Sequence, residues 1–173
     1  KRVNFNVLIV DDEKNIREGL GKALQLDGYN VILAENGNAA LEAISEYEID
    51  LVISDLKMPG LSGHELLRHI TSAYPMIQVI ILTGHGTIET AVDAMRDGAY
   101  DFLTKPVNLD RLSLLVKRAL SKRDLVVQHR ALKEEVLRMK NRQGYARIIG
   151  KSSQMKKVME VVEQVAPSKA SVL

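Results

Sequence analysis

The sequence contains no cysteine and no long hydrophobic run. Without cysteine, the 173 residues can form neither a disulfide bond nor a thiolate metal site, which fits a reducing compartment. The purely apolar stretches are short, such as VLIV at 7–10 and VIIL at 79–82, and neither a signal-peptide core nor a membrane span can be built from them. We therefore expect a soluble, cytoplasmic protein with no membrane partner.

The charges are divided unevenly along the chain. Residues 1–116 carry 10 Lys and Arg against 17 Asp and Glu, whereas residues 117–173 carry 14 against 5. A basic tail can contact nucleic acid, or it can be a solvated helix that faces an acidic neighbour. The tail lacks an aromatic-studded basic patch and a recognisable DNA-reading helix, so the second interpretation is favoured.

Two hydrophobic periodicities alternate over the first 120 residues. Short runs rich in β-branched or aromatic residues predict strands at 5–10, 30–34, 51–55, 78–83 and 100–104. Helical patterns lie between them, two of which stop at Gly28 and Gly98. Five such alternations predict an α/β fold with a five-stranded parallel sheet, doubly wound, in a domain of about 115 to 120 residues.

Polar residues stand where these predicted strands end. Asp11 and Asp12 follow the first strand, Asp55 ends the third, Thr83 ends the fourth, and Lys105 follows the fifth. Each has an ordinary explanation as a cap, a turn residue or a solvated loop residue. Ligands in open α/β sheets bind at the carboxyl ends of the strands, so the set as a whole points to a site.

The chemistry of this set is specific. Carboxylates without His or Cys suit Mg²⁺, which takes one or two carboxylates together with water and phosphate oxygens. A carboxylate can also be the nucleophile of phosphoryl transfer, in which case Lys105 and Thr83 would supply charge and a donor. Asp55 is therefore a candidate phosphoryl acceptor.

The strings VLIVDDE, DLVISDLKMPGLSG and VIILTGHGTIETAVDAMRDGAYDFLTKP resemble the receiver domain of two-component response regulators. The last string is especially similar to the NtrC class, which activates σ54-dependent transcription. The resemblance implies a receiver domain at 4–122 with the doubly wound fold of the flavodoxin and CheY type. It also implies phosphorylation by a sensor histidine kinase, and a protein that catalyses only its own phosphorylation and dephosphorylation.

The resemblance assigns a role to individual positions. It implies phosphorylation of Asp55, phosphoryl binding by Thr83 and Lys105, a rotamer switch at Phe102 coupled to Thr83, and a cis peptide bond before Pro106. The implied Mg²⁺ ligands are Asp11, Asp12, Asp55 and the backbone carbonyl of Lys57. We add the hypothesis that the side chains of Lys57 and His85, each two residues after a site residue, tune the lifetime of the aspartyl phosphate.

Residues 123–143 are interpreted as a helical linker and possible coiled coil. No Gly or Pro interrupts 109–141, which predicts a helix of over thirty residues. Leu125, Leu132 and Met139 are seven residues apart, with His129 and Val136 at intermediate heptad positions, so the stripe can pair two chains into a homodimer. Docking of the same stripe on its own chain is the competing interpretation.

Residues Gln143, Gly144 and Tyr145 are expected to break the helix. The GKSS that follows has the wrong glycine spacing for a phosphate loop, and Ser152 or Ser153 is expected to cap a helix from about 154 to 165. Residues 144–173 resemble the start of the AAA+ ATPase domain of NtrC-like regulators, truncated before the phosphate loop. ATP binding, DNA binding and contact with σ54 RNA polymerase would therefore belong to domains missing from this chain.

Two other classes of function fit these residues less well. A phosphatase with an Asp nucleophile would want an Asp-x-Asp pair after the first strand and a cap insertion, whereas this chain has adjacent acids there and short loops. A phosphorylation-independent interaction module would usually lack one of the acids or the Lys, and this set is complete.

Overall fold

The computed structural model describes residues 4–84 and 88–148, with side chains up to residue 142. Ten elements alternate along the chain. The strands are β1 (Asn6–Val10), β2 (Asn30–Ala34), β3 (Leu51–Asp55), β4 (Gln78–Thr83) and β5 (Asp101–Thr104). The helices are α1 (Lys14–Leu26), α2 (Gly37–Glu46), α3 (Gly63–Ala73), α4 (Ile88–Arg96) and α5 (Leu109–Ile148).

The strands form one parallel sheet in the order β2-β1-β3-β4-β5. The predicted five-stranded, doubly wound parallel sheet is therefore confirmed. The chain extends the sheet from β1 towards β2 on one side and from β3 towards β5 on the other. The strand order thus reverses between β1 and β3, which is the point at which such sheets bind ligands.

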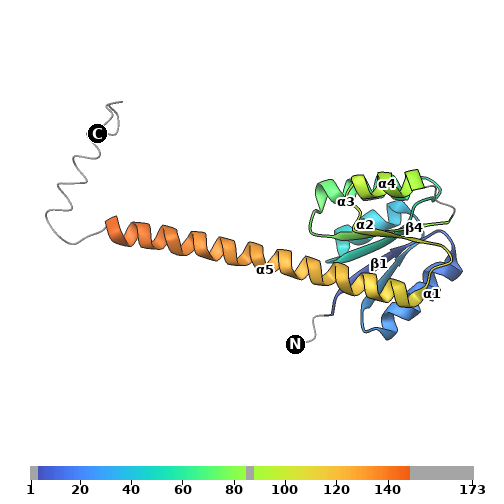
Figure 1. Ribbon diagram of the computed structural model, residues 1–173, viewed down its shortest axis with the longest axis horizontal. Coiled ribbons are helices and arrows are strands. Elements are labelled where there is room, and N and C mark those ends of the chain that lie inside the picture. Colours follow the sequence, from blue (N-terminus) through green and yellow to red (C-terminus); the bar gives the residue numbers. More distant parts are fainter. Residues whose placement is uncertain (1–3, 85–87, 149–173) are drawn as a thin grey trace, which may run out of the picture. The chain divides into compact units, whose positions relative to one another are not determined.

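Helices cover both faces of the sheet, as Figure 1 shows. Helices α2, α3 and α4 pack on the face that carries Val52, Val79 and Ile81. Helices α1 and α5 pack on the opposite face, over Ile53 and Ile80. Because β3 is buried on both faces, its sequence reads as a continuous apolar run and not as an alternating one.

The first part of α5 belongs to the domain core. Leu112, Val116 and Ala119 are fully buried against the sheet. One turn farther on, Nη2 of Arg123 lies 2.7 Å from Oδ1 of Asp50, and both side chains are mostly buried. This ion pair joins α5 to the loop that precedes β3.

The later part of α5 differs from the prediction. The helix continues through Gln143, Gly144 and Tyr145 to Ile148, so the predicted break at these residues was wrong. A single glycine costs an exposed helix only about 1 kcal/mol, and the next proline in the sequence, Pro167, is more than twenty residues away. The helix predicted near 154–165 lies outside the described residues.

The chain divides into two compact units, Lys1–Val127 and Gln128–Leu173. The domain boundaries expected at 122 and 143 remain predictions.

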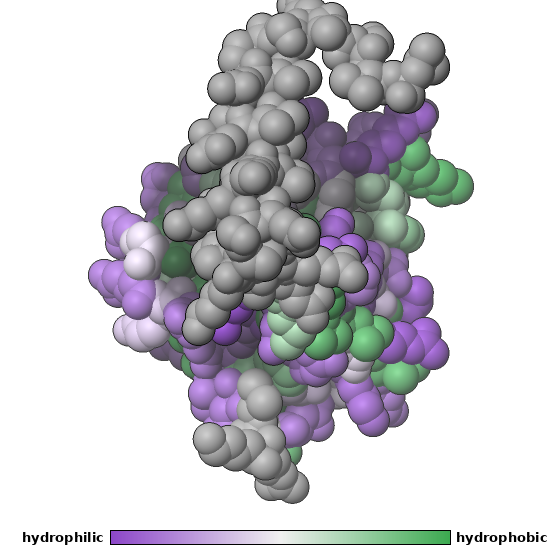
Figure 2. All heavy atoms as spheres, turned by 90° about the vertical axis from the view of Figure 1, so that its left-hand side faces the viewer, coloured by the Kyte–Doolittle hydropathy of each residue, from purple (hydrophilic) through white to green (hydrophobic). Residues whose placement is uncertain are grey.

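On the face seen in Figure 2, hydrophilic residues predominate and hydrophobic ones form small groups. Within the described ranges, no helix is long and apolar enough to cross a membrane.

Candidate functional site

Asp55 occupies the end of the central strand β3. Only 6% of its surface is exposed, and the apolar residues Val52 and Ile53 before it are fully buried. The carboxylate has therefore lost most of its hydration, and its ionised form is costly at this position unless a cation or hydrogen-bond donors are close by. Its surroundings consequently decide what it can do.

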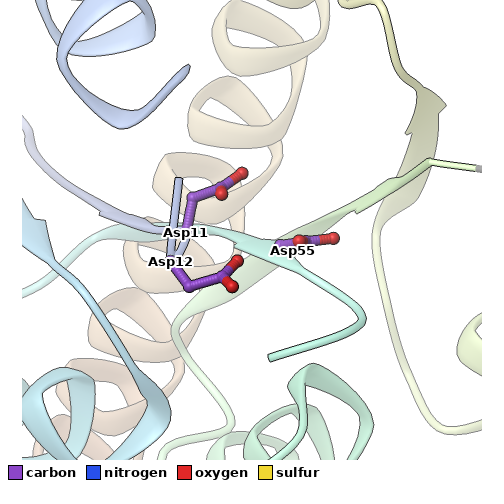
Figure 3. A group of neighbouring side chains, drawn as sticks. All are labelled: Asp11, Asp12 and Asp55. Carbon is purple, nitrogen blue, oxygen red and sulfur yellow. The ribbon is translucent and has the colours of Figure 1, made fainter. Parts of the chain in front are cut away.

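Two further carboxylates reach the same place from β1. Asp11 is fully buried and Asp12 is exposed, and both follow the last residue of that strand. One carboxylate oxygen each of Asp11, Asp12 and Asp55 lies within 4.8 Å of the others. Figure 3 shows the three side chains gathered at one edge of the sheet.

Lys105 brings a positive charge between the acids. Its Nζ lies 2.8 Å from Oδ2 of Asp11 and donates a hydrogen bond of 3.1 Å to Oδ2 of Asp55. The side chain is only 12% exposed. Its backbone N–H donates to the carbonyl of Thr83 at 2.7 Å, so the ends of β4 and β5 are held together, and the Lys105–Pro106 peptide bond is cis.

The electrostatics reflect this crowding. Burial raises the pKa of Asp55 above its ordinary value, and the neighbouring charge of Asp11 adds to this, although Lys105 opposes both. Burial alone would lower the pKa of Lys105, but its bonds to Asp11 and Asp55 outweigh burial and raise it. Lys105 therefore stays charged at neutral pH, while Asp55 is an acid whose ionised form is only partly compensated.

This donor set fits a magnesium ion. Oδ1 of Asp11 accepts a hydrogen bond from the backbone N–H of Glu13, and its buried Oδ2 is paired with the ammonium of Lys105 at 2.8 Å. A cluster of three carboxylates within 4.8 Å of one another, with a single ammonium beside them and no His or Cys, is the all-oxygen donor set that a hard divalent cation prefers. The receiver-type Mg²⁺ ligands inferred from the sequence are thus physically compatible with the arrangement.

Thr83 and Phe102 lie on neighbouring strands beside the acids. Thr83 ends β4 and is 3% exposed, and its partner in the sheet register is Thr104 of β5. Thr83 and Phe102 both line a cavity of about 650 Å³ against α4, whose other lining residues include Val92 and Met95. The two residues expected to act as a switch therefore line the same cavity, next to α4.

The start of α3 is fitted closely to the end of β3, which carries Asp55. Ser62 and Glu65 form a reciprocal capping box that fixes where the helix begins. Directly after the cap, the N–H of Gly63 donates to the carbonyl of Leu56 at 3.0 Å. A Cβ on Gly63 would stand 1.9 Å from the carbonyl oxygen of Asp55, so only glycine fits here.

The remaining sequence candidates are placed differently. The side chain of Lys57 is exposed, and the backbone of Lys57 hydrogen-bonds Asp55. His85 lies outside the described residues. Glu13, which the sequence reasoning left out, has Oε1 3.7 Å from Nζ of Lys105. Its only sequence signal is its place directly after the acidic pair.

Residues 7–117 match the family model described as the response regulator receiver domain. The chain belongs to this family. It is 38% identical over 167 residues to the C4-dicarboxylate transport transcriptional regulatory protein DctD of Pseudomonas aeruginosa, an alignment that covers 96% of the chain and 36% of that protein. It is 35% identical over 167 residues to the DNA-binding transcriptional regulator NtrC of Escherichia coli, with 96% and 34% covered.

Comparison with solved structures supports the same family assignment. The crystal structure of NtrX from Brucella abortus in complex with ADP superimposes with a TM-score of 0.67 at 36% identity, over 96% of this chain and 35% of that one. The chain is thus a receiver domain of NtrC-like two-component regulators, and it spans about a third of the length of the curated relatives it matches.

Proposed function

We propose that Asp55 accepts a phosphoryl group from a sensor histidine kinase, and that this modification switches an attached transcriptional regulator. The observation that carries the proposal is the position of Lys105, whose Nζ joins Asp11 and Asp55 at one buried edge of the sheet. A carboxylate nucleophile needs nearby positive charge because phosphoryl transfer spreads negative charge over the equatorial oxygens. Lys105 is positioned to supply it.

Asp11, Asp12, Asp55 and the carbonyl of Lys57 would hold Mg²⁺. The bound ion would neutralise charge on the phosphoryl oxygens. Asp11 is fixed for this task by two contacts, since its carbonyl accepts a hydrogen bond from Nη1 of Arg17 and its Oδ1 accepts one from Glu13. Asp12 is exposed and approaches from the solvent side.

Phosphorylation would be read out through Thr83, Phe102 and α4. A phosphoryl group adds roughly −1.5 to −2 charges and strong acceptor oxygens, which attract the Thr83 hydroxyl and the Lys105 ammonium. Movement of Thr83 towards Asp55 enlarges the space beside Phe102, because both side chains line the same cavity. The face made by α4, β5 and the start of α5 has two conformations, and phosphorylation shifts the equilibrium between them.

The side chains of Lys57 and His85 would set how long the phosphoryl group lasts. Lys57 is exposed and follows Asp55 by two residues, so its charge can order the water that attacks the phosphorus. The test is to measure decay of the aspartyl phosphate in Lys57→Ala and His85→Ala. Unchanged lifetimes in both variants would exclude this role.

The later part of α5 would pair two chains. Leu125, Leu132, Val136 and Met139 are between 49% and 68% exposed along one heptad stripe. In the same heptad frame Glu135 and Lys140 flank the stripe, five residues apart, at positions that meet across a parallel dimer. Opposite charges at those positions favour a parallel homodimer over an antiparallel one.

In a longer parent protein, this dimer would control an AAA+ ATPase that acts on σ54 RNA polymerase at DNA, in the cytoplasm where kinase and promoter are accessible. The support is the similarity of the chain to DctD and NtrC, whose names describe a transcriptional regulatory protein and a DNA-binding transcriptional regulator. Residues 144–173 would be the start of that ATPase domain.

The decisive experiment is incubation with acetyl phosphate and Mg²⁺, followed by mass spectrometry of the intact protein. The carboxylate of Asp55 should displace acetate and gain one phosphoryl group, and Asp55→Asn should gain none. Asp93→Asn, which removes an exposed acid from α4, is the matched control and should react normally. An interaction module would form no Asp55-dependent adduct, and a phosphatase would keep releasing phosphate from a small phosphoester.

A further inference from the structure

Asp97 directly follows the last residue of α4 and contacts α3 with both its side chain and its backbone. Its Oδ2 lies 2.5 Å from Nε2 of His64 and accepts a hydrogen bond of 2.7 Å from Nε of Arg68. Its carbonyl accepts a second hydrogen bond, of 3.1 Å, from the hydroxyl of Thr71. Three residues of α3 thus converge on one residue at the end of α4.

The turn after Asp97 reinforces this junction. Gly98 has a φ of 101°, and a Cβ at this position would stand 2.8 Å from Cγ2 of Thr71. The hydrogen bond from Arg68 holds the pKa of Asp97 below its ordinary value. The junction therefore combines close backbone packing with an ion pair, which fixes the end of α4 in both position and orientation.

Helix α3 is in turn fixed to the strand that carries Asp55. His64 immediately follows Gly63, whose N–H bonds the carbonyl of Leu56 and whose Cα lies against the backbone of Asp55. The C-terminal end of α4 is thus connected, through its contacts with α3, to the backbone of Asp55, the proposed phosphoryl acceptor. This connection reaches α4 at the end opposite to Thr83.

The rest of α4 is packed less completely. Ile88 at its start is 85% exposed, and Val92 and Met95 are each more than 40% exposed. The cavity shared with Thr83 and Phe102 lies against this same helix. The lining of this cavity runs along α4 from Ile88 to Arg96. A helix with unfilled space along its length and an ion pair directly after its last residue has room to tilt about that end.

We infer that Asp97 is a positioning residue of the switch: it fixes the end of α4 to α3, so that the rearrangement after phosphorylation is a tilt of α4 about Asp97 and Gly98. The inference rests on the proposed role of Asp55 and Thr83. It adds which end of α4 moves and which residue holds the other end. Asp97 acts on the output surface and does not touch the phosphoryl site.

Three backbone amides report directly on this anchor. The N–H groups of Asp97, Gly98 and Ala99 donate to carbonyls of α4 at 3.0 to 3.2 Å and should exchange slowly with deuterium. In the absence of ligand, Asp97→Asn should raise their exchange rates by about fivefold, since it removes the charge that His64 and Arg68 share. Asp93→Asn makes the same charge change on an exposed residue of the same helix and should leave them unchanged.

Beryllofluoride with Mg²⁺ then tests the tilt. In the wild-type protein it should alter exchange at 89–92 and leave 97–99 as before, whereas in Asp97→Asn the change should extend to 97–99. Equal exchange of the three amides in Asp97→Asn and wild type, or a wild-type response that is equally large at both ends of α4, would overturn the inference. If no Asp55-dependent adduct forms, the proposed function fails, and the ligand-free comparison still decides whether Asp97 is the anchor.

Discussion

The ammonium of Lys105 lies 3.1 Å from the carboxylate of Asp55 although fifty residues separate them in sequence. The same nitrogen lies 2.8 Å from Asp11, so one cation links the ends of β1, β3 and β5. Without it, three acids within 4.8 Å of one another would face each other with no compensating charge. This ammonium is consequently a structural group that holds the three strand ends together.

Replacing Lys105 should therefore destabilise the domain. We expect Lys105→Met to lower the free energy of unfolding in urea by about 2 kcal/mol without divalent ions, because buried carboxylates lose their partner. Mg²⁺ should restore part of the loss. Lys14→Met is the control, since Lys14 is 73% exposed and its pair with Glu18 contributes little. Equal losses in the two variants would contradict the assigned role of Lys105.

Replacing Asp55 should have the opposite effect on stability at neutral pH. The raised pKa of Asp55 means that the folded state binds a proton more readily than the unfolded chain does. The stability of the wild type therefore falls as the pH rises from the pKa of Asp55 in the unfolded chain to its higher pKa in the folded state. Asp55→Asn escapes this loss. Without Mg²⁺ it should be more stable at pH 7 by on the order of 1 kcal/mol, and should match the wild type near pH 4 or below.

The measurement is a series of urea denaturation curves from pH 4 to 8. The difference between Asp55→Asn and wild type should grow with pH and then level off above the pKa of Asp55 in the folded state. A difference that stays constant over this range would show that ionisation of Asp55 does not cost stability.

The sequence revealed the site because of the way parallel strands end. Asp11, Asp55 and Thr83 each follow an apolar run, and the topology places the ends of those runs at one edge. The sequence did not reveal the pairing of His64 and Arg68 with Asp97, because these contacts depend on how α3 and α4 pack, and hydrophobic patterns do not define that packing. The end of α5 was misjudged because one glycine is a weak stop signal.

Magnesium should stabilise the wild-type domain through Asp12. At a free concentration one hundred times the dissociation constant, binding adds about 2.7 kcal/mol to the free energy of unfolding. Asp12→Asn should lose most of this gain while differing little from wild type without metal, because Asp12 is exposed. Glu18→Gln, which neutralises a partly exposed acid on α1 outside the cluster, should keep the gain. Melting temperatures with Mg²⁺ and with chelator measure both effects.

Gly63 should not tolerate a methyl group. Gly63→Ala places a Cβ against the carbonyl of Asp55, so either α3 or the end of β3 must move, at a cost of about 2 to 4 kcal/mol. Gly19→Ala lies in the middle of α1, where the new Cβ would meet no atom within 4 Å apart from its chain neighbours and the backbone of its own helix, so it should instead stabilise by about 0.5 to 1 kcal/mol. Denaturation midpoints compare the two, and a neutral Gly63→Ala would contradict the close fit.

Two exposed leucines on α5 separate a dimer seam from general hydrophobicity. Leu132 is 62% exposed and lies on the heptad stripe, whereas Leu137 is 53% exposed and lies off it. If the stripe pairs two chains, Leu132→Ala should weaken the dimer roughly tenfold and Leu137→Ala should leave it nearly unchanged. Sedimentation equilibrium at several concentrations, with and without beryllofluoride, gives the dissociation constants. Equal weakening by both substitutions would mean that the exposed apolar surface associates without the heptad geometry, and a wild type that stays monomeric in both conditions would exclude the seam.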